Sequence, residues 1–61
     1  MQTVKKEAFY YSVLEVSLIL RVTPQTVRRY LKEGKLEGEK RGGFLLIPEN
    51  ALRKYLKLPV N

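Results

Sequence analysis

The chain has 61 residues, of which 12 are Lys or Arg and 6 are Asp or Glu, so its formal net charge at pH 7 is +6. A chain of this length forms one domain and buries only about 60% of the surface that its unfolded state exposes, so the core is expected to be thin. The sequence contains no cysteine and no histidine, which excludes disulfides and the usual zinc and iron ligand sets. We therefore expect neither a metal nor a cofactor, and stability has to come from packing and helix capping.

The positive charge attracts polyanions, and nucleic acid is the first candidate. An acidic membrane surface, or a role in solubility alone, also fits the charge. No apolar run approaches the roughly 20 residues that a membrane span needs, and the start of the chain lacks the apolar stretch and cleavage site of a secretory signal. We therefore expect a cytoplasmic protein with no membrane partner.

The N-terminal region divides into an arm and the start of a domain. Residues 1–7 mix polar and charged side chains without a regular period, so they are predicted to form a flexible arm ahead of a domain at residues 8–58. Residues 8–11 contain two tyrosines and a phenylalanine, which favours a short strand. A strand this short needs a partner sheet and otherwise frays.

The first helix is predicted over residues 13–20. Ser12 and Glu15 have the spacing of a capping box, in which each side chain accepts a hydrogen bond from the backbone of the other residue. One helix face gathers the residues expected in the core, Val13, Val16, Ser17 and Leu20. Leu14 and Leu18 fall on a different face, where they are ordinary apolar surface, a contact with another element, or a small self-association patch.

A second helix is predicted over residues 24–33. Thr23 can cap it, Pro24 suits its first position, and Gly34 suits the left-handed residue that ends it. Apolar side chains gather on one side and polar ones on the other, namely Val27, Tyr30 and Leu31 against Gln25, Arg28, Arg29 and Lys32. Only residues 21–22 separate the helices, which predicts a helix-turn-helix whose second helix is offered to a nucleic-acid groove.

A β-hairpin is predicted next. Residues 35–41 and 44–47 flank Gly42 and Gly43, and this glycine pair supplies the positive φ angles that tight hairpin turns require. Leu36 is expected to anchor the first arm, and the apolar second arm is expected to lie over the helices. The N-terminal strand either pairs with the hairpin to make a three-stranded sheet or stays frayed.

A last helix is predicted to open at Pro48 and to continue to about Lys57. Its residues expected to close the core are Ala51, Leu52, Tyr55 and Leu56. The predicted fold class is therefore α+β, a small winged helix-turn-helix with three helices, a hairpin wing and, where it pairs, a short N-terminal strand.

Catalysis has little support in this sequence. Histidine and cysteine, the usual groups for proton transfer and nucleophilic attack, are absent. No glycine loop of the P-loop kind is present, and a hairpin turn explains Gly42 and Gly43. We therefore expect no enzymatic activity.

DNA binding gains support from helix geometry, because a helix fits the major groove of B-DNA, which is about 12 Å wide. Arg29 points away from the apolar stripe and its planar fork can pair with guanine, while Gln25 can pair with adenine. Arg28 and Lys32 border that face and are expected to hold phosphates. The first turn, whose backbone amides can also hold a phosphate, adds Thr23 and Thr26. The alternative for each residue alone is a solvated helix face.

Three further residues are candidates for DNA contact. Lys40 and Arg41 stand at the predicted hairpin tip, from which they would reach the neighbouring minor groove or the backbone. The alternative is that turns are generally polar. Tyr30 is expected to pack its ring in the core and to keep its hydroxyl near the surface, within reach of a phosphate.

These residues resemble the excisionase-like helix-turn-helix domain, which is similar to the DNA-binding head of the MerR regulators. The resemblance covers about residues 10–56 and is most specific in three runs, VTPQTVRRY at 22–30, GKL at 34–36 and IP at 47–48. It implies a winged helix-turn-helix with residues 24–33 in the major groove and a wing at residues 40–44. It also implies phosphate contacts by Arg28 and Tyr30. MerR regulators continue into a coiled-coil helix and an effector segment, so for this chain we expect neither coiled-coil dimerisation nor effector sensing.

We therefore expect sequence-specific binding to double-stranded DNA. The expected role is that of an excisionase-like architectural factor that works with a recombinase, or that of a small transcription regulator. In either role we expect self-association or cooperative binding on adjacent sites. The rival hypothesis is a protein-interaction adaptor or inhibitor that docks on a regulator through Leu14 and Leu18. RNA binding is weaker, because it usually needs exposed aromatic rings and the tyrosines here are expected in the core.

Overall fold

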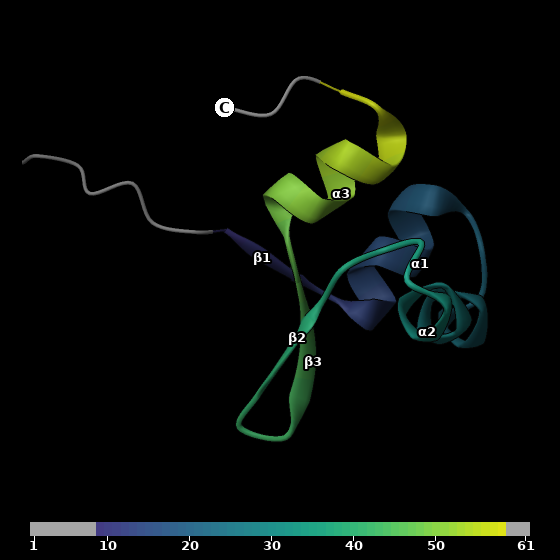
Figure 1. The fold of residues 1–61 in the computed structure, drawn as a ribbon. Coiled ribbons are helices and arrows are strands. Elements are labelled where there is room, and N and C mark those ends of the chain that lie inside the picture. The colour runs from purple at the N-terminus through teal and green to yellow at the C-terminus, as the bar shows by residue number, and fades with distance from the viewer. Residues whose placement is uncertain (1–8, 59–61) are drawn as a thin grey trace, which may run out of the picture.

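The fold combines a three-stranded antiparallel sheet with three helices, as seen in a computed structural model that describes residues 9–58 (Figure 1). The elements in chain order are β1 (Tyr10–Ser12), α1 (Val13–Leu20), α2 (Pro24–Glu33), β2 (Glu39–Arg41), β3 (Phe44–Pro48) and α3 (Glu49–Leu56). The predicted α+β winged helix-turn-helix is confirmed. The arm predicted at residues 1–7, together with Ala8, lies outside the described residues.

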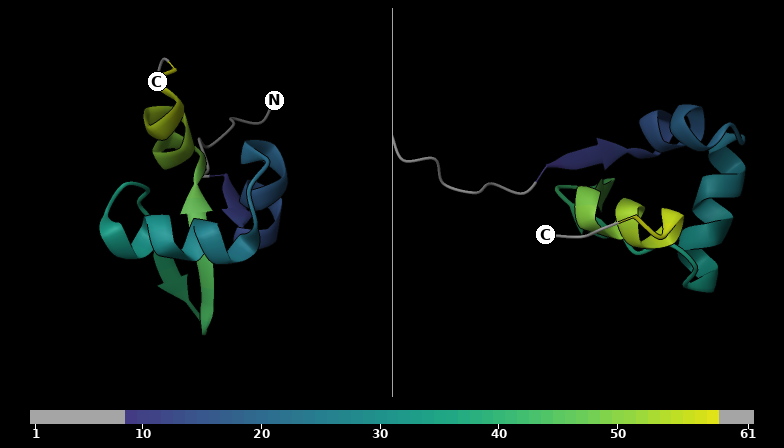
Figure 2. Two further views of the ribbon diagram at one scale, coloured as in Figure 1. Left: turned by 90° about the vertical axis from the view of Figure 1, so that its right-hand side faces the viewer. Right: turned by 90° about the horizontal axis from the view of Figure 1, so that it is seen from above.

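The helices surround the sheet unequally. The α1–α2 pair lies on one side of it, α3 lies near one end, and the β2–β3 hairpin projects in the opposite direction (Figure 2). Within the described residues, no helix is long and apolar enough to cross a membrane.

Strand β3 is the central strand, with β1 on one side and β2 on the other. The predicted N-terminal strand therefore pairs, but it begins at Tyr10 and extends to Ser12, which faces Leu46. The prediction placed this strand too early because it followed the aromatic residues alone. The position of the strand is fixed instead by its pairing with β3, where Tyr10 lies opposite Pro48.

The first hairpin arm is shorter than predicted, since β2 includes only Glu39–Arg41. The amides of Lys35 and Leu36 both donate to the Tyr30 carbonyl, at 3.0 and 3.3 Å, so these residues stay bound to the end of α2. The chain then passes so close to α2 that a Cβ atom at Gly38 would lie 2.9 Å from a leucine methyl group. Only beyond this point is the chain free to enter the sheet.

The helix ends follow the predicted capping. Ser12 and Glu15 form the capping box, with N–H to oxygen distances of 2.8 and 3.1 Å. Gly34 ends α2 at φ 81°, as expected. Arg21 ends α1 at φ 62°, a left-handed conformation that is uncommon for a residue other than glycine. Pro48 precedes α3 as its N-cap and does not occupy the first helical position as predicted.

The core lies where α1, α2 and α3 meet the sheet. Its buried members are Val13, Val16, Val27, Leu36, Ile47, Ala51 and Leu52. Two predictions about the core are wrong. Leu56 is 40% exposed, because it is the last residue of the short helix α3. Phe44, expected to lie over the helices with the rest of the second arm, is 71% exposed, because it directly follows the hairpin turn.

Candidate nucleic-acid interface

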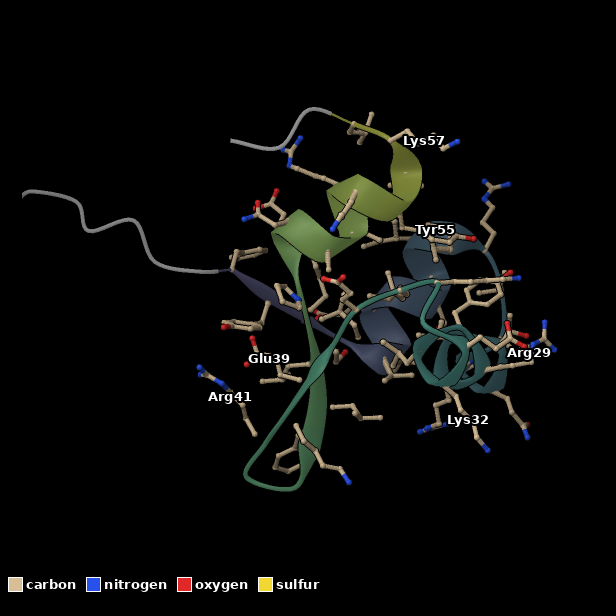
Figure 3. The ribbon with its side chains drawn as sticks, viewed as in Figure 1. Arg29, Lys32, Glu39, Arg41, Tyr55 and Lys57 are labelled. Carbon is tan, nitrogen blue, oxygen red and sulfur yellow. The ribbon has the colours of Figure 1, made fainter. Side chains whose placement is uncertain are left out.

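Helix α2 presents one face to the core and the opposite face to solvent. Val27 is completely buried, and Tyr30 and Leu31 pack against the core beside it. The side chains of Arg29 and Lys32 extend from the other face, away from α3 (Figure 3). The predicted division of this helix is therefore confirmed.

An open hollow of about 520 Å³ lies along the solvent face of α2. It is lined by Thr23, Gln25, Thr26, Arg28, Arg29 and Lys32, which we call the α2 front. Six of the nine predicted DNA-binding residues thus share one surface. Neither the sheet nor the hairpin covers this surface, so it can contact a long, rod-shaped partner.

The beginning of α2 leaves little backbone for binding an anion. Thr23 accepts a hydrogen bond from the Thr26 amide at 3.1 Å, and the two threonine hydroxyls lie 2.9 Å apart. Pro24 has no N–H group and the Thr26 amide is used by the cap, so among the described residues at this helix start only the Thr23 and Gln25 amides lack an acceptor within the chain. A phosphate at this end would therefore meet at most two backbone amides.

A second hollow, of about 420 Å³, lies between α1, α2 and the hairpin, and we call it the wing hollow. It is lined by Ser12, Val13, Leu14, Arg28, Lys40, Gly43, Phe44 and Leu45. Arg28 borders both hollows. The α2 front therefore continues onto the hairpin without interruption.

The two predicted hairpin cations lie on opposite faces of the sheet. Lys40 borders the wing hollow. The Arg41 Nε atom lies 3.3 Å from a Glu39 carboxylate oxygen, and its guanidinium lies 5.0 Å from the centre of the Tyr10 ring. Figure 3 shows this group on the side of the hairpin away from α2. Neighbouring strand residues point in opposite directions, so the structure brings Lys40, but not Arg41, to the wing hollow beside the α2 front.

Residues 10–57, from the start of β1 to just beyond α3, match the sequence model of a protein family that is described as a helix-turn-helix domain. The chain belongs to this helix-turn-helix domain family. The family includes excisionase-like DNA-binding domains and is typically non-enzymatic. A helix-turn-helix domain implies double-stranded DNA as its partner. No curated protein and no solved structure matches the chain.

Ion pairs distribute charge unevenly over this helix-turn-helix domain. Five basic residues lie within 4 Å of a glutamate, namely Arg29, Lys35, Arg41, Arg53 and Lys54. Among the described residues, Arg28, Lys32 and Lys40 contact no acid, and all three border the α2 front or the wing hollow. The exposed pairs add little stability. Four of them neutralise cations outside the two hollows, and the fifth involves Arg29 of the α2 front, so the two hollows keep three cations that no described acid neutralises.

Arg29 differs from its neighbours on the α2 front. Its Nε atom lies 3.8 Å from a Glu33 oxygen, and its guanidinium lies 5.8 Å from the centre of the Tyr30 ring. These contacts hold the side chain along the helix of this helix-turn-helix domain. Because the ion pair is exposed, a stronger acceptor can replace Glu33 at small cost.

Tyr30 lies apart from the predicted site. Its ring stacks on Tyr55 of α3 with the centroids 5.6 Å apart, and the Lys35 ammonium lies 5.5 Å from its centre. A hydrogen bond with Tyr30 raises the pKa of the Tyr55 hydroxyl. The expected packing of the ring is confirmed, but Tyr30 lines neither the α2 front nor the wing hollow of the helix-turn-helix domain.

The sequence prediction did not include the apolar lining of the wing hollow, formed by Leu14, Phe44 and Leu45. The sequence predicts Leu14 as apolar surface, a contact with another element or a self-association patch, and predicts that residues 44–47 lie over the helices. Strand alternation places Lys40 and Leu45 opposite each other on one sheet face, and could have indicated part of this lining. The approach of α1 depends on the angle between the helices, which spacing along the chain does not define.

Proposed function

We propose that this helix-turn-helix domain binds double-stranded DNA in a sequence-specific manner, with α2 in the major groove and the hairpin as a wing on the adjacent groove or backbone. The observation that carries the proposal is the position of three cations, Arg28, Lys32 and Lys40, on one open surface that runs from α2 to the hairpin; none of them contacts an acid in the part of the chain that the structure describes. An α-helix fits the major groove, and uncompensated cations on its flank attract the phosphates on either side.

The residues on this surface take two roles in the proposal. Arg29 and Gln25 read bases, because the guanidinium fork pairs with guanine and the amide with adenine. Arg28, Lys32 and Lys40 hold phosphates, because no acid among the described residues competes for their charge. On approach to DNA, Arg29 exchanges its exposed contact with Glu33 for a base edge.

The biological role that fits this binding is that of an excisionase-like architectural factor or a small transcription regulator acting in the cytoplasm. A domain of this size reaches few base pairs, so binding to adjacent sites side by side would increase its selectivity. An excisionase-like factor would work beside a recombinase, whereas a regulator would act at a promoter. A reporter assay and an excision assay with the same target duplex separate these roles.

Fluorescence anisotropy with random and genomic duplexes over a range of salt concentrations tests the proposal. We expect the affinity to fall with salt, with a log–log slope of about −0.9 for each phosphate neutralised. Arg29→Ala should relax base preference, whereas Lys40→Ala should weaken binding to all sequences alike. Lys54→Ala, which removes a charge from α3, is the matched control. Salt-independent or absent binding would reject the proposal, and equal, sequence-blind losses from Arg29→Ala and Lys40→Ala would reject the two roles.

One observation favours a second candidate function, that of an adaptor or inhibitor that docks on another protein. Leu14 and Leu18 are 60% and 72% exposed on α1. Retention of an acidic protein partner that is lost in Leu18→Ala, together with indifference to DNA, would favour this candidate.

A further inference from the structure

Phe44 differs from every other aromatic residue in its surroundings. The remaining five rings contact another ring or a guanidinium, Phe9 with Tyr11, Tyr10 with Arg41, and Tyr30 with Tyr55. In the part of the chain that the structure describes, Phe44 has no such contact, and it is 71% exposed. A large ring gains much free energy from leaving water, so a partner that covers Phe44 would gain affinity from it.

The position of Phe44 limits the shape of that partner. It is the first residue after the hairpin turn, where Gly42 and Gly43 have φ angles of 57° and 87°. Around either glycine, a Cβ atom would meet nothing within 4 Å, so the tip is slim and open on both sides. The hairpin also projects away from α3 (Figure 1). A slim projecting tip can enter the minor groove, which is about 6 Å wide.

The charges beside Phe44 favour DNA over an apolar protein surface. Phe44 lies opposite Arg41 in the hairpin register. At the tip it also borders the wing hollow together with Arg28 and Lys40, neither of which contacts an acid among the described residues. Covering this hollow with an apolar surface would remove two unpaired charges from water, which is costly. A sugar–phosphate strand of DNA would place phosphates beside both Arg28 and Lys40. The Phe44 ring would then lie at the minor groove next to that strand.

We propose that Phe44 enters the minor groove next to the major groove occupied by α2 and inserts its ring between two stacked base pairs. This inference rests on the proposed DNA binding and adds a deformation of the duplex to it. Apolar side chains that insert in this way unstack one step and kink the duplex by about 20–90°. Pyrimidine–purine steps deform most easily. The domain therefore prefers such a step at the position where Phe44 inserts, although no hydrogen bond recognises its bases.

The test uses the full 61-residue chain and a labelled target duplex. Donor and acceptor dyes at the two ends of the duplex report its bend, and 2-aminopurine at the base step where Phe44 inserts reports unstacking. The variants are Phe44→Ala, Phe44→Leu, which keeps an apolar wedge, and Leu18→Ala. Leu18 is the matched control because its exposure, 72%, is nearly the same and it lines neither the α2 front nor the wing hollow. Thermal unfolding of each variant verifies that the fold is intact.

We expect the parent chain to increase 2-aminopurine fluorescence and to shorten the distance between the dyes. Phe44→Ala should lose both signals and bind about tenfold more weakly. Phe44→Leu should keep part of the bend, and Leu18→Ala should behave like the parent. Retention of both signals in Phe44→Ala would overturn the insertion, as would weaker binding of that variant with an unchanged bend. Failure of the parent to bind any duplex would overturn the proposed function itself and this inference with it.

Discussion

Two sets of basic residues in this small domain differ in what lies beside them. On the α3 side, Lys35, Arg53 and Lys54 lie 3.6, 3.2 and 3.7 Å from glutamate oxygens. On the α2 and wing side, Arg28, Lys32 and Lys40 contact no acid among the described residues. Each described acid except Glu15, which caps α1, is used to neutralise a cation. Three cations without an acidic partner among the described residues therefore lie together on one surface, so the attraction of a polyanion depends on the side from which it approaches.

The largest expected effect comes from neutralising the unpaired set as a whole. Replacing Arg28, Lys32 and Lys40 by alanine removes three phosphate contacts in the proposed complex. With a slope of about −0.9, each phosphate contact raises the binding constant roughly eightfold as the salt concentration falls from about 1 M to about 0.1 M. Loss of three such contacts should therefore reduce the affinity at about 0.1 M salt several-hundredfold. Anisotropy titrations at several salt concentrations should also show the slope reduced by about 0.9 for each residue replaced.

The control for this prediction replaces Lys35, Arg53 and Lys54 by alanine, which removes the same amount of charge from the opposite side. We expect only a few-fold loss and an unchanged salt slope, because these residues touch no phosphate in the proposed complex. Equal losses in the two triple variants would show that total charge, and not its position, governs binding.

The sequence contains enough information to predict this fold but not the division of charge. Capping signals at Ser12, Thr23 and Gly34 act locally, so the bounds of α1 and α2 are predicted correctly. The bounds of β1 and β2 depend on pairing with β3 and on how tightly the chain folds around the end of α2, so local propensity misplaces them. The contact between Lys54 and Glu37 joins α3 to the connection between α2 and β2, which no periodicity along the chain reveals.

Arg29 is the exception to this division, because it lies on the α2 front and still contacts Glu33. If it reads a guanine, Arg29→Ala should reduce the preference for that base by about 1–3 kcal/mol, roughly tenfold or more in relative affinity. Selection from a randomised duplex library, followed by titration of single-base variants, measures this change.

Glu33→Gln is the companion variant for Arg29, because it releases the arginine and removes a negative charge near the DNA. We expect affinity to rise modestly for all sequences and the base preference to remain. A lost preference in Glu33→Gln would mean that the carboxylate positions Arg29 for reading and does not merely compete with DNA for it.

Within residues 9–58, Arg21 and Lys57 contact no acid, and they line neither the α2 front nor the wing hollow, so they separate the effect of charge on DNA binding from the effect of its position. Lys57 ends α3 in the left-handed conformation, at φ 60°. Lys57→Gly should therefore raise the free energy of unfolding by about 1 kcal/mol and leave DNA affinity almost unchanged. Gly34→Ala, at φ 81°, should lower it by a similar amount. Urea unfolding measures both changes, and a destabilised Lys57→Gly would contradict the expectation.

The smallest expected effect concerns the ring pair that joins α2 to α3 on the neutralised side. A hydrogen bond with Tyr30 favours the neutral form of Tyr55, so the pKa of Tyr55 is raised above its usual value of 10.0. The folded chain thus holds this proton more tightly than the unfolded chain. The resulting stabilisation is complete below about pH 10 and is lost as the pH rises through the raised pKa. Phenolate absorbance should show one late-titrating tyrosine that disappears in Tyr55→Phe and persists in the control Tyr11→Phe. If a late-titrating tyrosine remained in Tyr55→Phe, the raised pKa would belong to another tyrosine. The contact between α2 and α3 would then lack this pH dependence.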